Sequence, residues 1–172
     1  MAIKPLIDAN VIAARVSELA HQITRDYLGK ELVIVPVLKG SFVFAADLVR
    51  HIDLDVSIDF LRVRSYDDGT ESSGVVEITT DLSQSIEGKH VILVEDIVDT
   101  GLTVEYLTQN LTTRAPASLK LASLLHKPSR TRKRAQIDYL GFTIEDVFVV
   151  GYGLDHAQKY RNLPYLAVVV DD

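Results

Sequence analysis

The sequence contains no cysteine and no tryptophan, and it has a single methionine among its 172 residues. Without cysteine the chain can form neither a disulfide framework nor a thiolate metal site, and it suits a reducing compartment. No stretch approaches the ~18 consecutive apolar residues of a membrane-spanning helix. Residues 1–10 also lack the apolar segment of a secretion signal. We therefore expect a cytoplasmic protein with no membrane partner.

Several motifs of enzymes and nucleotide-binding proteins are also missing. Neither G-x-x-x-x-G-K-[S/T] nor G-x-G-x-x-G occurs in the sequence. The five histidines show no zinc-binding spacing, and no G-x-S-x-G pattern marks a serine nucleophile. The net charge is −6, and the one basic run, residues 127–134, has no interleaved aromatic residues. This pattern favours a solvated loop over a nucleic-acid surface.

What is present is an ordinary globular composition, with 47% hydrophobic and 24% charged residues. The length indicates one domain, residues 1–172. Short, buried-type apolar runs alternate with segments of helical periodicity, which predicts an α/β fold with a mainly parallel, twisted sheet flanked by helices.

The expected elements follow from apolar spacing, β-branched runs and turn residues. We expect helices between Asp8 and Gly29, over residues 42–51 and over residues 104–111. We expect strands over residues 32–38, 54–64, 75–79, 91–94, 118–125 and 166–170, and a polar, mobile loop over residues 65–74.

The most informative segment is residues 91–103, Val-Ile-Leu-Val-Glu-Asp-Ile-Val-Asp-Thr-Gly-Leu-Thr. An apolar strand is followed by two acids, Glu95 and Asp96, and then by a turn with a glycine and two threonines. Such a turn before a helix offers backbone N–H groups to a phosphate. Because Glu95, Asp96 and Asp99 repel a bare phosphate, the ligand should also bring hydroxyl groups or a divalent metal. A phosphorylated sugar with Mg²⁺ fits this pattern.

Residues 95–103 resemble the phosphoribosyl pyrophosphate binding motif of the type I phosphoribosyltransferases, in the form found in the hypoxanthine-guanine members. Three further motifs occur in the family order: a Leu-Lys-Gly-Ser turn at residues 38–41, the pair Ser65-Tyr66, and Phe-Val-Val-Gly-Tyr-Gly-Leu-Asp at residues 148–155. The resemblance extends over most of residues 32–172. It implies the type I phosphoribosyltransferase fold, with a small hood from the C-terminal segment and part of the N-terminus, and a flexible flap loop at about residues 65–79. It also implies a cis peptide bond between Leu38 and Lys39.

The resemblance further implies a reaction and a set of site residues. The reaction is Mg²⁺-dependent transfer of the 5-phosphoribosyl group from phosphoribosyl pyrophosphate to N9 of hypoxanthine or guanine, with Asp99 as the proton acceptor. The implied phosphoribosyl site comprises Glu95, Asp96, Asp99, Thr100, Gly101, Leu102 and Thr103. The implied pyrophosphate site comprises Lys39, Gly40 and Arg161. The implied purine site comprises Lys127, Phe148, Val149 and Asp155. The implied flap residues are Ser65 and Tyr66, and the implied metal ligands are Glu95, Asp96 and Asp155. A homodimer or homotetramer is expected from the same resemblance.

Two other function classes remain open at this point. A regulatory protein could keep the same pocket as a sensor of phosphoribosyl pyrophosphate, although the acidic composition and the retained Asp99 and Lys127 speak against it. A flavodoxin-like binding module would leave the acids beside the phosphate turn unexplained. Leu102 departs from the lysine that some relatives carry there, which removes one phosphate contact but leaves the backbone donors.

Overall fold

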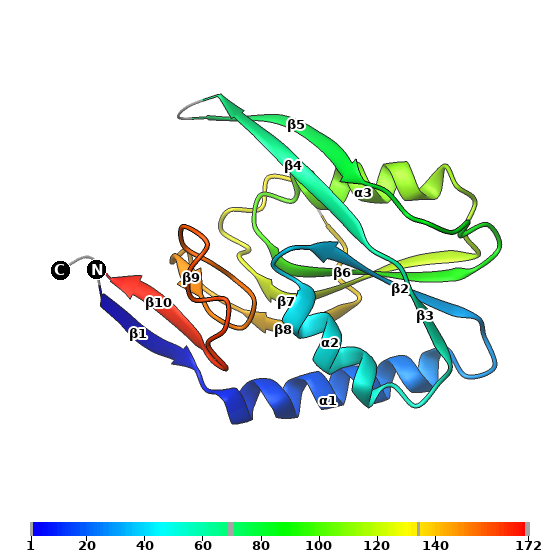
Figure 1. Ribbon diagram of the computed structural model, residues 1–172, viewed down its shortest axis with the longest axis horizontal. Coiled ribbons are helices and arrows are strands. Elements are labelled where there is room, and N and C mark those ends of the chain that lie inside the picture. The colour runs from blue at the N-terminus through cyan, green and yellow to red at the C-terminus, as the bar shows by residue number, and fades with distance from the viewer. Residues whose placement is uncertain (1, 69–70, 134, 171–172) are drawn as a thin grey trace.

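The computed structural model describes residues 2–68, 71–133 and 135–170, and of residues 66–68 and 71–75 only the backbone. Its centre is a seven-stranded sheet in the order β5-β4-β2-β6-β7-β8, with β3 also paired to β2 (Figure 1). The strands are β2 (Leu32–Leu38), β3 (Val56–Ile58), β4 (Leu61–Asp68), β5 (Glu71–Thr80), β6 (His90–Val98), β7 (Ser118–His126) and β8 (Tyr139–Thr143). All pairs are parallel except β4 with β5.

Two hydrophobic clusters lie on the two faces of this sheet. The helices α1 (Ala9–Asp26) and α2 (Phe42–His51) cover one face, and α3 (Leu102–Thr112) covers the other (Figure 1). Neighbouring residues of β6 point to opposite faces, since Ile92 belongs to the first cluster and Leu93 to the second. A strand buried on both faces must be apolar throughout, which explains the unbroken apolar run before the acid pair.

A second, smaller sheet joins the two ends of the chain. Its strands are β1 (Ala2–Ile7), β10 (Leu166–Val170) and β9 (Val149–Val150), all antiparallel, and Figure 1 shows it beside the carboxyl ends of β6 and β7. Val149 pairs with Val168 of β10, and the backbone N–H of Val169 donates to the carbonyl of Phe148. The small sheet therefore fixes the position of the Phe148-Val149 segment over the end of the large sheet.

The α/β class with a mainly parallel sheet is confirmed, and several expected elements have the expected bounds. β2, α2 and β10 match the expected ranges residue for residue. α1 begins after Asp8, and its apolar positions, spaced three or four residues apart, are buried. The structure contains no helix, among the residues it describes, that is long and apolar enough to cross a membrane.

Two expectations about strands and loops were wrong, and some strands were not expected at all. The strand expected over residues 54–64 is interrupted at Asp59 and Phe60, because the Asp59 carboxylate accepts hydrogen bonds from the backbone of residues 60, 83 and 84. Of the loop expected over residues 65–74, residues 65–68 and 71–74 belong instead to the antiparallel pair of β4 and β5, whose backbone pairing needs no apolar side chains. β1 and β8 were not expected, since their apolar patterns are short.

The flap prediction can be followed only in part. Ser65 lies in β4 and is exposed, but the side chain of Tyr66 and the whole of residues 69–70 lie outside the described residues. Figure 1 shows the β4–β5 hairpin projecting beyond the rest of the large sheet.

Candidate active site

The acid pair lies inside β6, not beyond its end as expected, because β6 continues its pairing with β7 as far as Val98. Burial, and secondly the neighbouring Asp96, raise the pKa of Glu95 well above its ordinary value. Burial also raises the pKa of Asp96. One carboxyl oxygen of Glu95, Oε1, is buried and finds no hydrogen-bond partner among the described residues. An unpaired buried oxygen is costly, so the site favours a ligand that brings hydroxyl groups or a cation.

The turn after β6 has the geometry of an anion cradle. Gly101 is the N-cap of α3 with φ of 86°, and the backbone N–H of Glu105 donates to its carbonyl at 2.9 Å. A Cβ at Gly101 would lie 2.6 Å from the carbonyl oxygen of Lys133, so glycine is required here for both conformation and space. The first backbone N–H groups of α3 have no partner within the helix and can bind an anion.

A second turn, after β2, lies against the acid pair. The peptide bond between Leu38 and Lys39 is cis, as the resemblance implies. A Cβ at Gly40 would lie 1.6 Å from Asp96 Oδ2, so only glycine allows this close approach. Ser41 Oγ donates to the carbonyl of Val37 at 2.6 Å and does not cap α2. The two turns thus face one another across the carboxylates.

A cavity of about 300 Å³ lies between the two turns. The predicted site residues that line it are Lys39, Gly40, Glu95, Asp96, Asp99, Gly101 and Thr103. Thr100 and Leu102 belong to the same turn but do not line this cavity; Thr100 Oγ1 instead accepts from the backbone N–H of Leu102 at 3.4 Å. Leu102 is the first residue of α3.

A second cavity, of about 210 Å³, adjoins the first. The predicted site residues that line it are Asp96, Asp99, Lys127, Phe148, Val149 and Asp155. Phe148 is 53% exposed, whereas Lys127 is only 8% exposed. An exposed aromatic ring beside a buried ammonium group suits a flat heterocycle with a carbonyl edge. Asp96 and Asp99 border both cavities, so the two form one continuous site.

Arg161 does not line either cavity, but it is tied to residues that do. Its guanidinium group donates to the carbonyl of Gly153 at 2.8 Å and pairs with Asp155 Oδ1 at 2.9 Å. Gln158 Oε1 accepts from Arg161 at 3.4 Å and from Lys39 Nζ at 3.3 Å. Gln158 therefore joins the two cations predicted for the pyrophosphate site.

After the buried Lys127, the basic run is the exposed loop that we expected, since the side chains of Arg130, Arg132 and Lys133 are exposed; its backbone, however, is attached to the cradle. The backbone N–H groups of Arg132 and Lys133 both donate to the carbonyl of Thr100, and Thr131 Oγ1 donates to the carbonyl of Asp99. Arg130 Nε lies 2.7 Å from Asp99 Oδ1. This segment packs against the cradle because the preceding strand, β7, ends beside β6.

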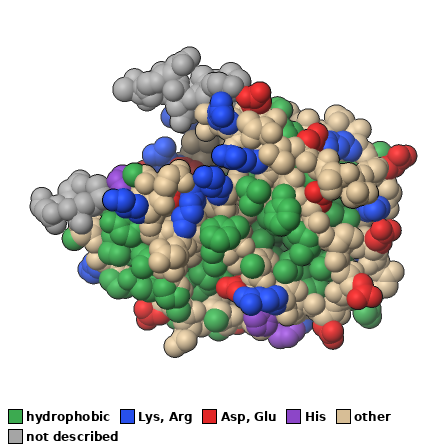
Figure 2. All heavy atoms as spheres, viewed as in Figure 1, with side chains coloured by type: hydrophobic (Ala, Val, Ile, Leu, Met, Phe, Trp, Pro, Cys, Tyr) green, Lys and Arg blue, Asp and Glu red, His purple; other side chains and the backbone are tan. Residues whose placement is uncertain are grey.

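The charge distribution suits an anionic ligand despite the net charge of −6. Figure 2 shows Lys and Arg side chains gathered between the small sheet and the β4–β5 hairpin. A local group of cations attracts an anion that the total charge repels.

The acid pair also has the donors for a divalent metal. No three His, Cys, Asp or Glu side chains converge in the described part of the chain to form a complete metal site. Mg²⁺, however, commonly binds one or two carboxylates and takes its remaining ligands from substrate phosphates and water. Glu95, Asp96 and the unpaired Glu95 Oε1 fit that requirement.

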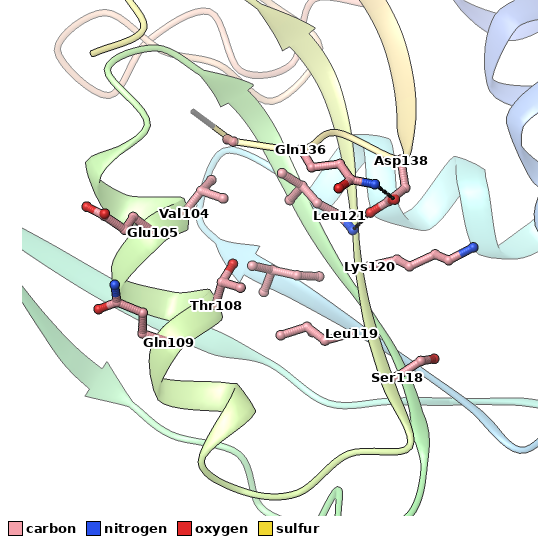
Figure 3. A pocket seen from close by; sticks show the side chains of 12 residues that line it. Val104, Glu105, Thr108, Gln109, Ser118, Leu119, Lys120, Leu121, Gln136 and Asp138 are labelled. Atoms are coloured by element: carbon pink, nitrogen blue, oxygen red, sulfur yellow. Dashed lines mark hydrogen bonds between the residues drawn. The ribbon is translucent and has the colours of Figure 1, made fainter. Parts of the chain in front are cut away.

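A larger cavity, of about 540 Å³, lies between α3 and β7 and does not contain these groups. Figure 3 shows Val104 and Thr108 of α3 facing it from one side and Leu119 and Leu121 of β7 from the other. The Asp138 carboxylate at its edge already accepts from Leu121 N and from Gln136. We assign no chemistry to this cavity.

Sequence analysis missed three polar residues of the site: Gln158, Arg130 and Asp146. Arg130 lay in a run interpreted as solvated, and Gln158 matches no motif. Asp146 Oδ1 lies 3.7 Å from Lys127 Nζ, and its other oxygen lies 3.5 Å from Arg130. Asp146 stands two positions before Phe148, which is the one signal that could have identified it.

Comparison with known proteins gives consistent matches. Residues 5–157 match the family model of the phosphoribosyl transferase domain. The chain is 46% identical to the hypoxanthine-guanine phosphoribosyltransferase of Streptococcus pneumoniae, over 98% of this chain and 94% of that protein. It is 49% identical to the hypoxanthine phosphoribosyltransferase of Haemophilus influenzae, over 96% and 94%. The crystal structure of a hypoxanthine-guanine phosphoribosyltransferase from Bacillus anthracis matches with a TM-score of 0.93 at 50% identity, covering 97% of this chain and 98% of that chain.

Proposed function

Since the chain belongs to the phosphoribosyl transferase domain family, we propose that it transfers the 5-phosphoribosyl group from phosphoribosyl pyrophosphate to N9 of hypoxanthine or guanine. The products are the purine nucleotide, IMP or GMP, and pyrophosphate, which is a purine salvage reaction. The observation that supports this best is the junction of two cavities at Asp96 and Asp99. One cavity offers an anion cradle and acids, and the other offers an aromatic ring and an ammonium group.

The cradle at residues 99–103 binds the 5-phosphate through backbone N–H groups in this proposal. Glu95 and Asp96 accept hydrogen bonds from the ribose hydroxyls, which supplies a partner for the buried Glu95 oxygen. Fixing the sugar at both ends holds its anomeric carbon at the mouth of the purine cavity. The carboxylates also stabilise the positive charge that develops on the sugar as the bond to pyrophosphate breaks.

Lys39, the backbone at Gly40, and Arg161 bind the departing pyrophosphate. Lys39 and Arg161 already share Gln158 as a hydrogen-bond partner, so they lie on the same side of the site. Glu95, Asp96 and Asp155 do not converge on one point in the ligand-free protein, so Mg²⁺ would be held by these carboxylates only through substrate oxygens that complete its ligands. When bound, it would neutralise charge on the pyrophosphate. Asp155 must then share its carboxylate between the metal and Arg161.

The purine lies against Phe148 in this proposal, with the backbone of Val149 along its edge. Lys127 donates a hydrogen bond to the 6-carbonyl, which selects against adenine because the adenine amino group would face a donor. N9 forms the bond to the anomeric carbon as the pyrophosphate oxygen leaves. The proton lost from the purine imidazole ring passes to Asp99.

The proposal is tested by incubating the purified protein with Mg²⁺ and phosphoribosyl pyrophosphate and each of hypoxanthine, guanine, xanthine and adenine. We expect nucleotide and an equal amount of pyrophosphate with hypoxanthine or guanine, and little with adenine. Omission of Mg²⁺ should abolish the reaction. Tight binding of phosphoribosyl pyrophosphate without nucleotide formation from any base would instead identify a sensor. The relatives reported above are named as enzymes, and they give that regulatory alternative no support.

Several features of the wider molecule belong to the same proposal. The whole chain acts as one phosphoribosyltransferase domain, in which the small sheet is the hood and the β4–β5 hairpin is the flap. A cytoplasmic location rests on the composition, and a homodimer or homotetramer rests on the family resemblance. Light scattering on the eluted protein would measure the subunit number directly.

A further inference from the structure

Four charged side chains of alternating sign form a row whose two ends, Asp99 and Lys127, line the purine cavity. Asp99 Oδ1 lies 2.7 Å from Arg130 Nε, and Arg130 Nη1 lies 3.5 Å from Asp146 Oδ2. The second oxygen of Asp146 lies 3.7 Å from Lys127 Nζ. The two ends of the row, Asp99 and Lys127, contact the substrate in the proposed reaction. The two middle residues, Arg130 and Asp146, have no role in it so far.

The middle residues can move while the segment that bears them stays in place. The turn containing Arg130 is attached to the cradle, because Thr131 Oγ1 donates to the carbonyl of Asp99 and the next two backbone N–H groups donate to Thr100. The side chains of Arg130 and Asp146 are nevertheless 47% and 49% exposed. Lys127 differs, since its side chain is only 10% exposed and its backbone N–H donates to Val98. The guanidinium group can thus change partners without unfolding the turn.

The ion pair between Arg130 and Asp99 conflicts with proton transfer to Asp99. Once the carboxylate takes up the purine proton, Arg130 loses its nearest anionic partner. Asp99, followed by Asp146, raises the pKa of Arg130, so the guanidinium group remains charged and is attracted to any other carboxylate within reach. Asp146 is already within reach, but in the ligand-free protein it is shared with Lys127.

We infer that Arg130 and Asp146 are positioning residues that couple recognition of the purine carbonyl to release of Asp99. This inference rests on the function proposed above. When Lys127 turns its ammonium group to the 6-carbonyl, it gives up Asp146. Arg130 then pairs fully with Asp146 and leaves Asp99, whose Oδ1 is free to accept the proton from the purine ring.

The exchange leaves every charge with a partner. Before the purine enters, two carboxylates balance two cations. After proton transfer, Asp99 is neutral, Arg130 pairs with Asp146, and Lys127 donates to the carbonyl oxygen. Lys127, the one buried side chain of the four, has a polar partner at both stages, which avoids the desolvation penalty of an unpaired buried ammonium group. A base without the 6-carbonyl would not draw Lys127 away, so it would leave Asp99 paired with Arg130.

The test compares Arg130→Met, Asp146→Asn and the double variant, using hypoxanthine and unsubstituted purine, which lacks the 6-carbonyl. Asp146→Asn removes the receiving carboxylate, so kcat with hypoxanthine should fall about 10-fold while KM for phosphoribosyl pyrophosphate stays unchanged. Adding Arg130→Met to that variant should restore kcat to within about 3-fold of the unaltered protein, because Asp99 is no longer held. Arg130→Met alone should raise kcat with unsubstituted purine and so reduce the advantage of hypoxanthine.

Arg132→Met, in the same turn, is the matched control and should change neither kcat nor its dependence on the carbonyl. Equal kcat values for Asp146→Asn and the double variant would overturn the proposed exchange of partners by Arg130. An unchanged ratio of kcat with hypoxanthine to kcat with unsubstituted purine in Arg130→Met would overturn it as well. Thermal unfolding of each variant separates these results from misfolding. The proposed function fails separately, if the unaltered protein forms no nucleotide from hypoxanthine.

Discussion

At the scale of single residues, Asp99 borders both the phosphate cavity and the purine cavity, as Asp96 does, and it is also the proposed acceptor of the purine proton. The cradle beside it binds through backbone groups, which a side-chain substitution leaves in place. Binding of the sugar phosphate and acceptance of the purine proton are therefore separable. A substitution of Asp99 should therefore change the reaction rate without changing the affinity for phosphoribosyl pyrophosphate.

Asp99→Asn should lower kcat by about 10²- to 10⁴-fold, the usual contribution of a general base. Calorimetric titration with phosphoribosyl pyrophosphate and Mg²⁺ should show an affinity within a few-fold of the original. Thr103→Ala should show the opposite pattern: Thr103 lines the cavity between the two turns, and loss of its hydroxyl should weaken phosphoribosyl pyrophosphate binding. An unchanged kcat in Asp99→Asn would refute the role of Asp99.

Glu95→Gln should stabilise the ligand-free protein at neutral pH. The folded protein raises the pKa of Glu95 above the ordinary value of 4.5. Stability from the protonated group is therefore fully present below about pH 4.5, and it is lost as the pH rises toward the folded-state pKa, because the unfolded chain ionises first. Glutamine cannot ionise, so this loss disappears.

Thermal unfolding between about pH 4 and 8 measures the effect of Glu95→Gln. The variant should have the higher Tm at neutral pH and a flatter dependence on pH. Glu87→Gln changes an exposed glutamate and is the matched control. A variant with a lower Tm at neutral pH would show that Glu95 is stabilised by a partner in the folded protein.

At the scale of elements, the site is made by turns that lie close together at the ends of β2 and β6. A Cβ would collide with the Asp96 carboxylate at Gly40 and with a backbone carbonyl at Gly101 and Gly153. The carbonyl oxygen of Gly40 would lie 2.3 Å from a Cβ at Gly153. The turn after β2 is therefore in direct contact with the loop that follows Phe148 and Val149. The geometry of one turn therefore depends on the others.

Gly101→Ala should weaken binding of phosphoribosyl pyrophosphate by more than it destabilises the fold. Its φ of 86° disfavours any side chain by about 1 kcal/mol, and its Cβ would also displace the segment at Lys133. Gly88→Ala is a close control, because Gly88 has φ of 71° but nothing within 4 Å of a Cβ. Equal effects of both variants on substrate affinity would contradict the cradle.

Tyr152→Phe should loosen the contact between the purine loop and α2. Tyr152 is 5% exposed, and its hydroxyl donates to Asp47 of α2, the helix that follows the Lys39 turn. Loss of this hydrogen bond should cost about 1–2 kcal/mol and raise KM for both substrates. Tyr139→Phe removes a similar hydrogen bond, to Asp26 at the end of α1, and should destabilise without changing KM. Steady-state kinetics with denaturant unfolding distinguishes the two.

At the scale of the whole molecule, the two sheets contribute different residues to the site. The large sheet supplies both turns and Lys127, and the small sheet holds Phe148 and Val149 above them. The two are joined through the hydrophobic cluster that contains Leu166 of β10 together with residues of α1 and α2. The opposite cluster, under α3, has no residue of the small sheet.

Leu166→Ala should therefore affect the purine more than the sugar phosphate. Leu166 is fully buried, and its truncation should cost about 2–5 kcal/mol of unfolding free energy. The position of Phe148 depends on the strand that Leu166 anchors, so KM for hypoxanthine should rise while KM for phosphoribosyl pyrophosphate changes little. Leu107→Ala, an equally buried position on the inner face of α3, should destabilise similarly with no preference for the purine. Parallel KM changes in both variants would contradict the division.

The sequence by itself determined the elements and motifs that depend on interactions between residues close together in the chain. The apolar run of β2, the periodicity of α2 and the ordered acids, threonines and glycine of residues 95–103 all depend on neighbours along the chain. The α/β class and the resemblance to phosphoribosyltransferases follow from these short-range patterns.

Only the tertiary structure decided what depends on segments far apart in the chain. The polar residues of the β4–β5 hairpin pair through backbone hydrogen bonds, which leave no apolar pattern in the sequence. The attachment of β1 to β10, the contact of Tyr152 with Asp47, and the ion pair of Arg130 with Asp99 are equally invisible in local patterns. Hydrogen bonds and ion pairs require partners at about 3 Å, and only the folded chain brings such partners together.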